Sequence, residues 1–120
     1  MSKAGLSFDT VREIGLEMTG VEEGMSYGLP ALKVDGRLVA CVPGHKSAEA
    51  GSLVVSMDFE QRAALMEEMP EAFYLPEHYR NYPFLLVRLG QINVEQLRGL
   101  LKSACRVVQA QGRRKGERKK

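Results

Sequence analysis

The chain of 120 residues has no tryptophan, only two cysteines, and no apolar run of about 18 residues. Without such a run, no helix is expected to span a membrane. Asp9, Arg12 and Glu13 follow closely on Met1, so the first residues also lack the apolar stretch of a signal peptide. The hydrophobic share of 44% and the charged share of 27% are those of an ordinary globular domain. We therefore expect a folded, cytoplasmic domain rather than a fibrous, disordered or membrane protein.

The two cysteines, Cys41 and Cys105, are 64 residues apart and form no CxxC pair. Zinc-ribbon and thioredoxin-like sites need such pairs, so the sequence excludes both. Each cysteine lies among apolar neighbours, where a free thiol packs as a small hydrophobic side chain. We expect both thiols to be reduced, as in a cytoplasmic protein.

The formal charge of +2 is unevenly distributed. Residues 113–120 contain six basic side chains and one acidic side chain, whereas residues 1–112 contain 11 basic and 14 acidic ones. No linker or internal repeat divides the longer part. We predict a single α+β domain over residues 1–112, which is slightly acidic, and a basic, disordered tail over residues 113–120.

Three segments have the pattern of helices. Apolar residues at three- and four-residue steps predict a first helix over residues 7–18. Asp58 and Asn93 are each followed by glutamine three positions later, the pattern of a capping box at a helix N-terminus. The helix that begins after Asp58 must stop before Pro70. The last helix has an apolar seam at regular spacing: Val94, Leu97, Leu101, Ala104 and Val108.

The dipeptide Asp35-Gly36 lies between two β-favouring runs, which predicts a hairpin over residues 31–42. Further strands are predicted over residues 52–57 and 84–89. The two-residue turn places four side chains on the face toward the helices: Leu32, Val34, Val39 and Cys41. The predicted order is α-β-β-β-α-β-α, an α+β fold of two layers, with an antiparallel sheet and the helices on one face.

Catalytic motifs are absent around the two histidines, His45 and His78. Neither lies in a metal-binding spacing, and the run from Gly44 to Ser47 departs from a phosphate-binding loop because the lysine does not directly follow the glycine. No GxSxG or GxGxxG occurs. We predict a protein that is not an enzyme and has no metal or cofactor. An acid–base pair of His78 with Glu22 or Glu23 is the remaining catalytic hypothesis.

Basic side chains recur at four-residue steps on the last predicted helix: Arg98, Lys102 and Arg106. They form one stripe that points toward the basic end of the chain, and such a stripe can neutralise successive phosphates of a nucleic acid. Two structural roles explain the same pattern. Cations near a helix C-terminus complement its dipole, and their long stems cover the edge of an apolar face.

Several segments, in order, resemble the MmcQ/YjbR family over residues 6–108. The matching segments are residues 21–34, 43–52, 70–82, 86–89 and 100–106. The positions that match its motifs are Tyr27, Gly28, Pro30, Lys33, His45, Lys46, Ser47, His78, Tyr79 and Arg88. The resemblance implies a CyaY/frataxin-like fold and a protein predicted to bind DNA, without a known cofactor. Many members have tryptophan where this chain has Cys105, so a stacking role at that position is missing here.

The resulting prediction is weak binding of double-stranded DNA, mainly through phosphates. The candidate residues are Lys33, Arg37, Lys46, Arg88, Arg98, Lys102, Arg106, Arg113, Arg114 and Lys115. The alternative is a module, monomeric or homodimeric, that binds a protein or a small ligand on the open sheet face and the loop over residues 76–83. We expect apolar Leu38, Val42 and Phe84 on that face beside Lys33.

Overall fold

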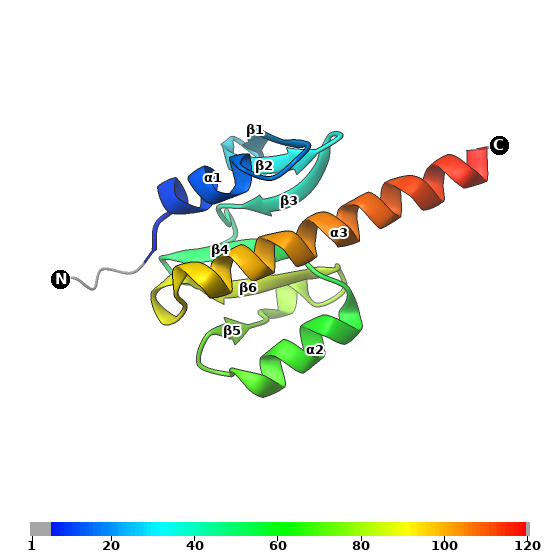
Figure 1. Cartoon of the computed structure of the whole chain (residues 1–120). Helices are drawn as coiled ribbons and strands as arrows, with labels where there is room; N and C mark the ends of the chain where they lie inside the picture. Colours follow the sequence, from blue (N-terminus) through cyan, green and yellow to red (C-terminus); the bar gives the residue numbers. More distant parts are fainter. Residues whose placement is uncertain (1–5, 120) are drawn as a thin grey trace.

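Six antiparallel strands form one sheet in the order β1-β2-β3-β4-β6-β5 (Figure 1). The computed structural model describes residues 6–119, with side chains described for residues 6–111. The predicted disordered tail, residues 113–120, falls outside the residues described with side chains. The elements are α1 (Phe8–Leu16), β1 (Val21–Ser26), β2 (Leu29–Val34), β3 (Arg37–Cys41), β4 (Ser52–Ser56), α2 (Phe59–Glu68), β5 (Phe73–Tyr74), the 3₁₀ turn η1 (Glu77–Tyr79), β6 (Phe84–Arg88), the 3₁₀ turn η2 (Leu89–Gln91) and α3 (Val94–Lys119).

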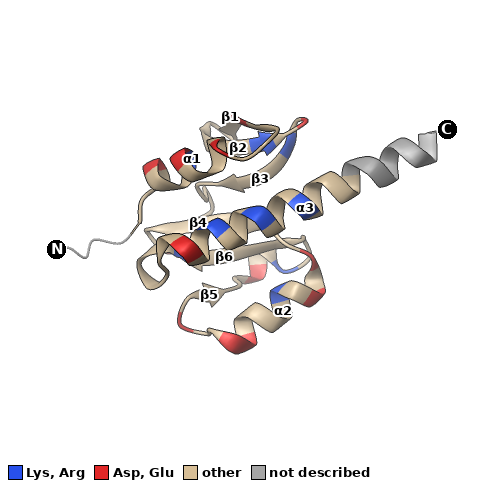
Figure 2. Ribbon diagram, in the orientation of Figure 1, with Lys and Arg blue, Asp and Glu red and all other residues tan. Residues whose placement is uncertain are grey.

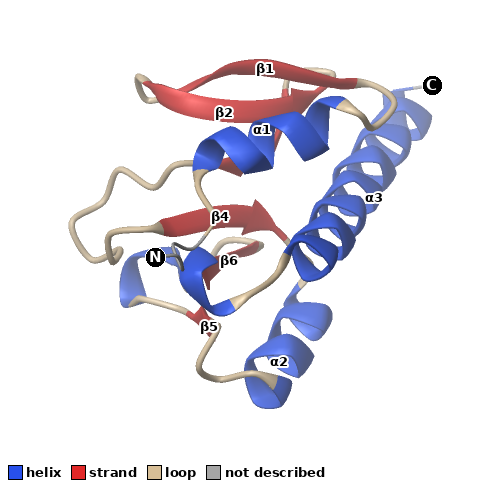
Figure 3. Cartoon of the chain, turned by 60° about the vertical axis from the view of Figure 1, so that its left-hand side comes forward, coloured by secondary structure: helices blue, strands red, loops and turns tan. Residues whose placement is uncertain are grey.

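Helices cover one face of this sheet. α3 crosses β2, β3 and β4, α1 packs on β1 and α3, and α2 lies beside β5 and β6 (Figure 3). The main core fills the space between the two layers, with Leu53, Leu85, Leu97 and Leu101 fully buried. This arrangement confirms the predicted α+β fold of two layers. Within residues 6–119, no helix is long and apolar enough to cross a membrane.

Both predicted capping boxes begin helices. The Asp58 carboxylate accepts a hydrogen bond from the Gln61 N–H at 2.7 Å. Asn93 and Gln96 exchange side-chain-to-backbone hydrogen bonds of 2.8 and 2.9 Å. α2 ends at Glu68, before the proline, as predicted. These local contacts satisfy N–H groups that a helix N-terminus leaves unpaired.

The predicted seam of α3 is confirmed except at its first residue. Leu97, Leu101, Ala104 and Val108 are buried, whereas Val94 is 40% exposed in the first turn, before α3 reaches the sheet. α1 is shorter than expected and ends at Leu16 rather than two residues later.

The hairpin of β2 and β3 pairs Val34 with Arg37, as the Asp35-Gly36 turn predicts. Farther from the turn a β-bulge shifts the register, leaving Val39 as the extra residue in β3. An extra residue reverses the alternation of faces beyond it. The prediction that Cys41 faces the helices was therefore wrong, because its side chain packs on the opposite face.

Two strands were not predicted, so the observed order is α-β-β-β-β-α-β-β-α. β1 is an edge strand whose Glu22 and Glu23 are exposed, and it joins β2 through a turn at Tyr27-Gly28. Charged side chains on an edge strand discourage pairing with another sheet, and they also remove the apolar alternation by which strands are recognised. β5 is only two residues long.

A second, smaller core lies on the sheet face away from the helices. It contains Ala31, Cys41, Val54, Tyr79 and Leu86. The serines of β4 on this face are buried, and both have partners: Ser52 Oγ lies 2.5 Å from the Tyr74 hydroxyl, and Ser56 Oγ donates to a backbone carbonyl. The segments before β4 and after β5 therefore cover part of the face that we expected to be open.

The different burial of Leu101 and Val94 predicts different losses of stability when each is replaced by alanine. Leu101→Ala should lower the free energy of unfolding by about 3 kcal/mol, because it leaves a cavity between α3 and the sheet. Val94→Ala, in the same predicted seam but half-exposed, should cost about 0.5 kcal/mol or less. Urea unfolding measures both values, and similar costs for the two variants would contradict the observed packing of α3.

Candidate functional site

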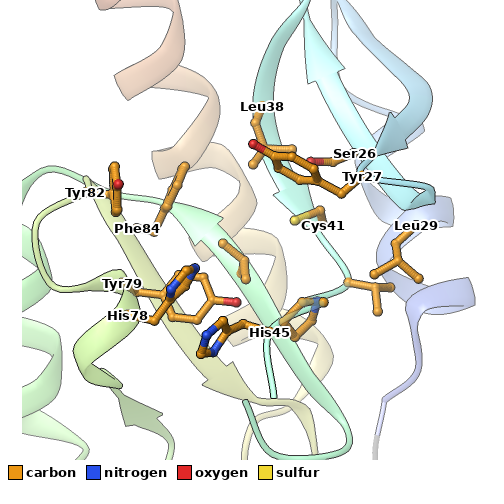
Figure 4. A pocket seen from close by; sticks show the side chains of 14 residues that line it. Ser26, Tyr27, Leu29, Leu38, Cys41, His45, His78, Tyr79, Tyr82 and Phe84 are labelled. Atoms are coloured by element: carbon orange, nitrogen blue, oxygen red, sulfur yellow. The ribbon is translucent and has the colours of Figure 1, made fainter. Parts of the chain in front are cut away.

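Three segments that are distant in the sequence surround a cavity of about 680 Å³ on the sheet face away from the helices (Figure 4). They are the β1–β2 turn, the start of the loop after β3, and the segment that contains η1. Their aromatic and imidazole rings line it: Tyr27, His45, His78, Tyr79, Tyr82 and Phe84. Among the described side chains, no lysine, arginine, aspartate or glutamate lines this cavity.

His45 and His78 stack on each other at one side of the cavity. Their ring centroids are 3.7 Å apart and the planes differ by 11°. The Tyr79 ring meets both imidazoles edge-on and is buried. Burial raises the pKa of Tyr79, and a hydrogen bond from the backbone of His45 partly offsets this, so the phenol is protonated at neutral pH.

Ser47 determines which nitrogen of His45 carries the proton. The backbone N–H of Ser47 donates to Nδ1 of His45 at 3.1 Å, and the Ser47 hydroxyl lies 2.7 Å from the same nitrogen. The neutral ring therefore carries its proton on Nε2. Desolvation lowers the pKa of His45, and the neighbouring His78 and Lys46 lower it further. The ring is thus an uncharged hydrogen-bond donor at neutral pH.

Tyr27 occupies a backbone position that disfavours a tyrosine. Its φ is +52°, that of Gly28 is +79°, and its side chain is fully exposed. Turns with two positive φ values usually carry asparagine or aspartate followed by glycine. Neither the strained backbone nor the exposed ring stabilises the fold, whereas the ring borders the cavity (Figure 4). Strain of this kind is concentrated at ligand-binding sites.

Cys41 contributes the one thiol of the cavity lining. Burial raises its pKa to about 11, although a hydrogen bond with Ser26 and the charge of Lys33 act in the opposite direction. The group is therefore a thiol rather than a thiolate at neutral pH, and it is a weak nucleophile.

Most motif positions of the family resemblance lie at or beside this cavity, whereas Lys33, Lys46 and Arg88 do not line it. Tyr27, His45, His78 and Tyr79 line it, Ser47 orders His45, and Gly28 and Pro30 lie in the turn and strand that carry Tyr27. Tyr82 also lines the cavity, beside Phe84 with the ring centroids 6.3 Å apart, and was not among the predicted site residues. Tyr82 lies in the loop over residues 76–83, which the alternative prediction of a binding module had named, and this was the one indication of its role in the sequence.

The acid–base hypothesis for His78 requires Glu22 or Glu23 beside its ring, and the structure places both glutamates on the edge strand β1. Glu22 lies opposite Lys33 on the edge strand, and a carboxylate oxygen of Glu23 is 3.7 Å from Arg12. Neither glutamate lines the cavity that His78 borders. Within the described residues, no group of three histidine, cysteine or acidic side chains is placed to hold a metal ion.

The basic residues predicted to bind DNA are distributed over several surfaces (Figure 2). Lys33 lies on β2 opposite Glu22, Arg37 lies at the first position of β3, and Lys46 lies in the loop after β3. Arg113, Arg114 and Lys115 fall outside the residues described with side chains. The described ones among these, Lys33, Arg37 and Lys46, lie on elements other than α3.

Arg88 is occupied by contacts within the protein. Its guanidinium makes two hydrogen bonds of 2.9 Å to the carboxylate of Glu49, lies 4.4 Å from the ring centroid of Tyr74, and donates to the carbonyl of Glu71. The hydrogen bonds that Arg88 donates to Glu49 raise the pKa of the guanidinium. Arg88 therefore ties the loop before β4 to the sheet, and its charge is already neutralised.

The stripe on α3 does bring three cations together. Arg98, Lys102 and Arg106 border a shallow groove of about 450 Å³ against the C-terminal end of α1. Arg98 is paired with Glu17 at 3.0 Å, while Lys102 and Arg106 are exposed. Two cations of the stripe are thus exposed to solvent on the helix side of the molecule.

A crystal structure from Deinococcus radiodurans has the same fold. That protein, DR2400, is described by the domain of unknown function DUF419, and it superposes on this chain with a TM-score of 0.72. The alignment covers 92% of this chain and 83% of the other, with 19% sequence identity. At this identity the likeness establishes the architecture alone. No protein-family model and no curated protein matches the sequence.

Because the pKa of His45 is lowered in the folded chain, we expect the free energy of unfolding to depend on pH. The pKa of His45 is below its ordinary value of 6.5 in the folded chain, so the unfolded chain binds more protons as the pH falls. This contribution is fully present above pH 6.5 and is lost as the pH falls below it. Between about pH 7.5 and pH 5.5, the urea midpoint of the parent chain should therefore fall more than that of His45→Gln. Parallel curves for the two proteins would contradict this prediction.

Proposed function

We propose that this protein is a binding domain for a small molecule, with its site in the cavity between Tyr27, the His45–His78 stack and Tyr82. The observation that carries the proposal is the cavity itself. Its volume of about 680 Å³ lies in the range of ligand pockets, and its lining is mainly apolar and aromatic with a few polar groups. The strained, exposed Tyr27 at its edge supports the same conclusion.

The chemistry of the lining favours binding over catalysis. The thiol of Cys41 is protonated at neutral pH, because its pKa is about 11. No carboxylate among the described residues lines the cavity to orient either imidazole as a general base. The two histidines stack on one another and Ser47 engages Nδ1 of His45, so the Nε2–H of His45 is the donor that this ring can offer to a ligand.

Tyrosine fluorescence reports on this site, because the chain has four tyrosines and no tryptophan, and three of the four line the cavity. Planar aromatic probes, neutral and anionic, should change this fluorescence and shift the amide resonances of Tyr27, His45 and Tyr82. Tyr27→Ala should weaken binding by about threefold to tenfold, the loss expected for one aromatic contact.

Phe59→Ala is the matched control. Phe59 is a half-exposed aromatic residue on α2, outside the cavity lining, so its removal should leave probe affinity unchanged. Equal losses in the two variants, or resonance shifts that avoid the cavity, would contradict the proposed site.

Double-stranded DNA is the second candidate ligand, and the stripe on α3 supports it. Arg98, Lys102 and Arg106 lie along one side of the helix at four-residue spacing, which suits contacts to successive phosphates. The resemblance to the MmcQ/YjbR family also implies DNA binding. The acidic balance of residues 1–112 and the pairing of Arg98 with Glu17 make strong binding unfavourable.

The salt dependence of DNA affinity tests this candidate. Replacing Lys102 and Arg106 with alanine should reduce the slope of log K against log salt by about 1.8, since each phosphate contact contributes about 0.9. Lys33→Ala is the control, because Lys33 lies on β2 facing away from the helices. Affinity that does not respond to salt, or an equal effect of the control, would rule out phosphate contacts along α3.

A further inference from the structure

Two lysines lie near residues of the cavity lining, and neither of them lines the cavity itself. Lys46 follows His45 directly, and its charge contributes to the lowered pKa of that ring. The charge of Lys33 likewise acts to lower the pKa of the Cys41 thiol, against the larger effect of burial. Glu49 is paired with Arg88 at 2.9 Å, Glu77 is paired with Arg80 at 3.1 Å, and Glu22 lies opposite Lys33 on the edge strand. The described lining itself contains no lysine, arginine, aspartate or glutamate, so the imidazoles are the groups there that can carry a positive charge.

The imidazole pair can supply one positive charge. Its rings are 3.7 Å apart, so a proton on one ring strongly disfavours a second proton on the other. With Nδ1 of His45 engaged by Ser47, its Nε2–H is the free donor. A carboxylate carries one negative charge and accepts hydrogen bonds of this kind.

We infer that the cavity binds a flat organic carboxylate, and that binding is coupled to the uptake of one proton by the His45–His78 pair. This inference rests on the proposed function. The flat body suits the aromatic lining, where Tyr27 stands at one side and the Tyr82–Phe84 pair at another (Figure 4). A phosphate is a poorer match, because its second charge calls for an arginine, a lysine or a helix N-terminus, and the described lining contains none.

The proton comes from solvent and enters the imidazole pair. The ligand is already ionised near neutral pH, whereas His45 is uncharged because its pKa is lowered. Tyr79, which packs against both rings, does not compete for this proton because its phenol is already protonated, and the thiol of Cys41 in the same lining is protonated as well. A carboxylate beside the rings stabilises the imidazolium, so one proton is taken up for each ligand bound.

The test compares 2-naphthoate with 2-naphthamide, which has the same flat body without the charge. Titration calorimetry and tyrosine fluorescence would measure both affinities at about pH 8 and about pH 6. Naphthoate should bind about tenfold more tightly at the lower pH, and naphthamide should change by less than about twofold. Calorimetry in buffers of different ionisation enthalpy should show uptake of about one proton with naphthoate alone.

His78→Gln and His45→Gln should each flatten the pH dependence of naphthoate binding, and at the lower pH each should weaken naphthoate more than naphthamide. Both residues lie in surface segments, and an unchanged unfolding transition at about pH 8 confirms that each variant is folded. Lys46→Gln is the matched control for charge beside the stack. It should leave the proton uptake near one.

The possible outcomes distinguish a wrong ligand class from a wrong binding site. Equal affinity of naphthoate and naphthamide, independent of pH, would overturn the carboxylate assignment and leave the proposed cavity in place. Tighter binding of 2-naphthyl phosphate than of naphthoate would overturn it as well. If none of the three probes binds, the proposed function itself fails.

Discussion

A sheet with two apolar faces needs cover on both, and this chain has helices for only one. Leu53 and Leu85 are buried on the side of the helices, while Val54 and Leu86, their neighbours in the same strands, face the other side. Two loops must cover that second side. Arg88 and Tyr74 hold the first of them through Glu49, and η1 provides Tyr79. Loops cannot fill such a surface as completely as a helix does, and the cavity is the part left uncovered.

Features that depend on neighbours in the sequence were predictable, and those that depend on distant contacts were not. The caps at Asp58 and Asn93 and the Asp35-Gly36 turn involve residues within four positions of one another. The bulge that turns Cys41 to the other face depends on how β3 pairs with β2, so strict alternation misassigned it. The edge strand β1 was not predicted, because its mostly exposed side chains lack the apolar alternation by which strands are recognised.

The same distinction applies to charge. The stripe on α3 follows from helical spacing and could be predicted, whereas the pairing of Arg88 with Glu49 joins residues 39 positions apart. The sequence around a single arginine or lysine therefore does not show whether a distant carboxylate neutralises its charge. The rings of the cavity are separated in the same way, since His45 and His78 meet only because the loops of the second face converge. The family motifs pointed to these residues without indicating that they touch.

The two candidate sites lie on opposite sides of the sheet, and this placement constrains how they influence each other. Between them stand β3 and β4, whose buried side chains pack against α3 on one side and against the second core on the other. A ligand in the cavity contacts loops and strand side chains, none of which belongs to α3. Any effect on Lys102 or Arg106 must pass through a closely packed sheet that resists small displacements. Binding at the cavity and phosphate contact along α3 are thus expected to be independent, and a strong coupling would require a second arrangement of the sheet.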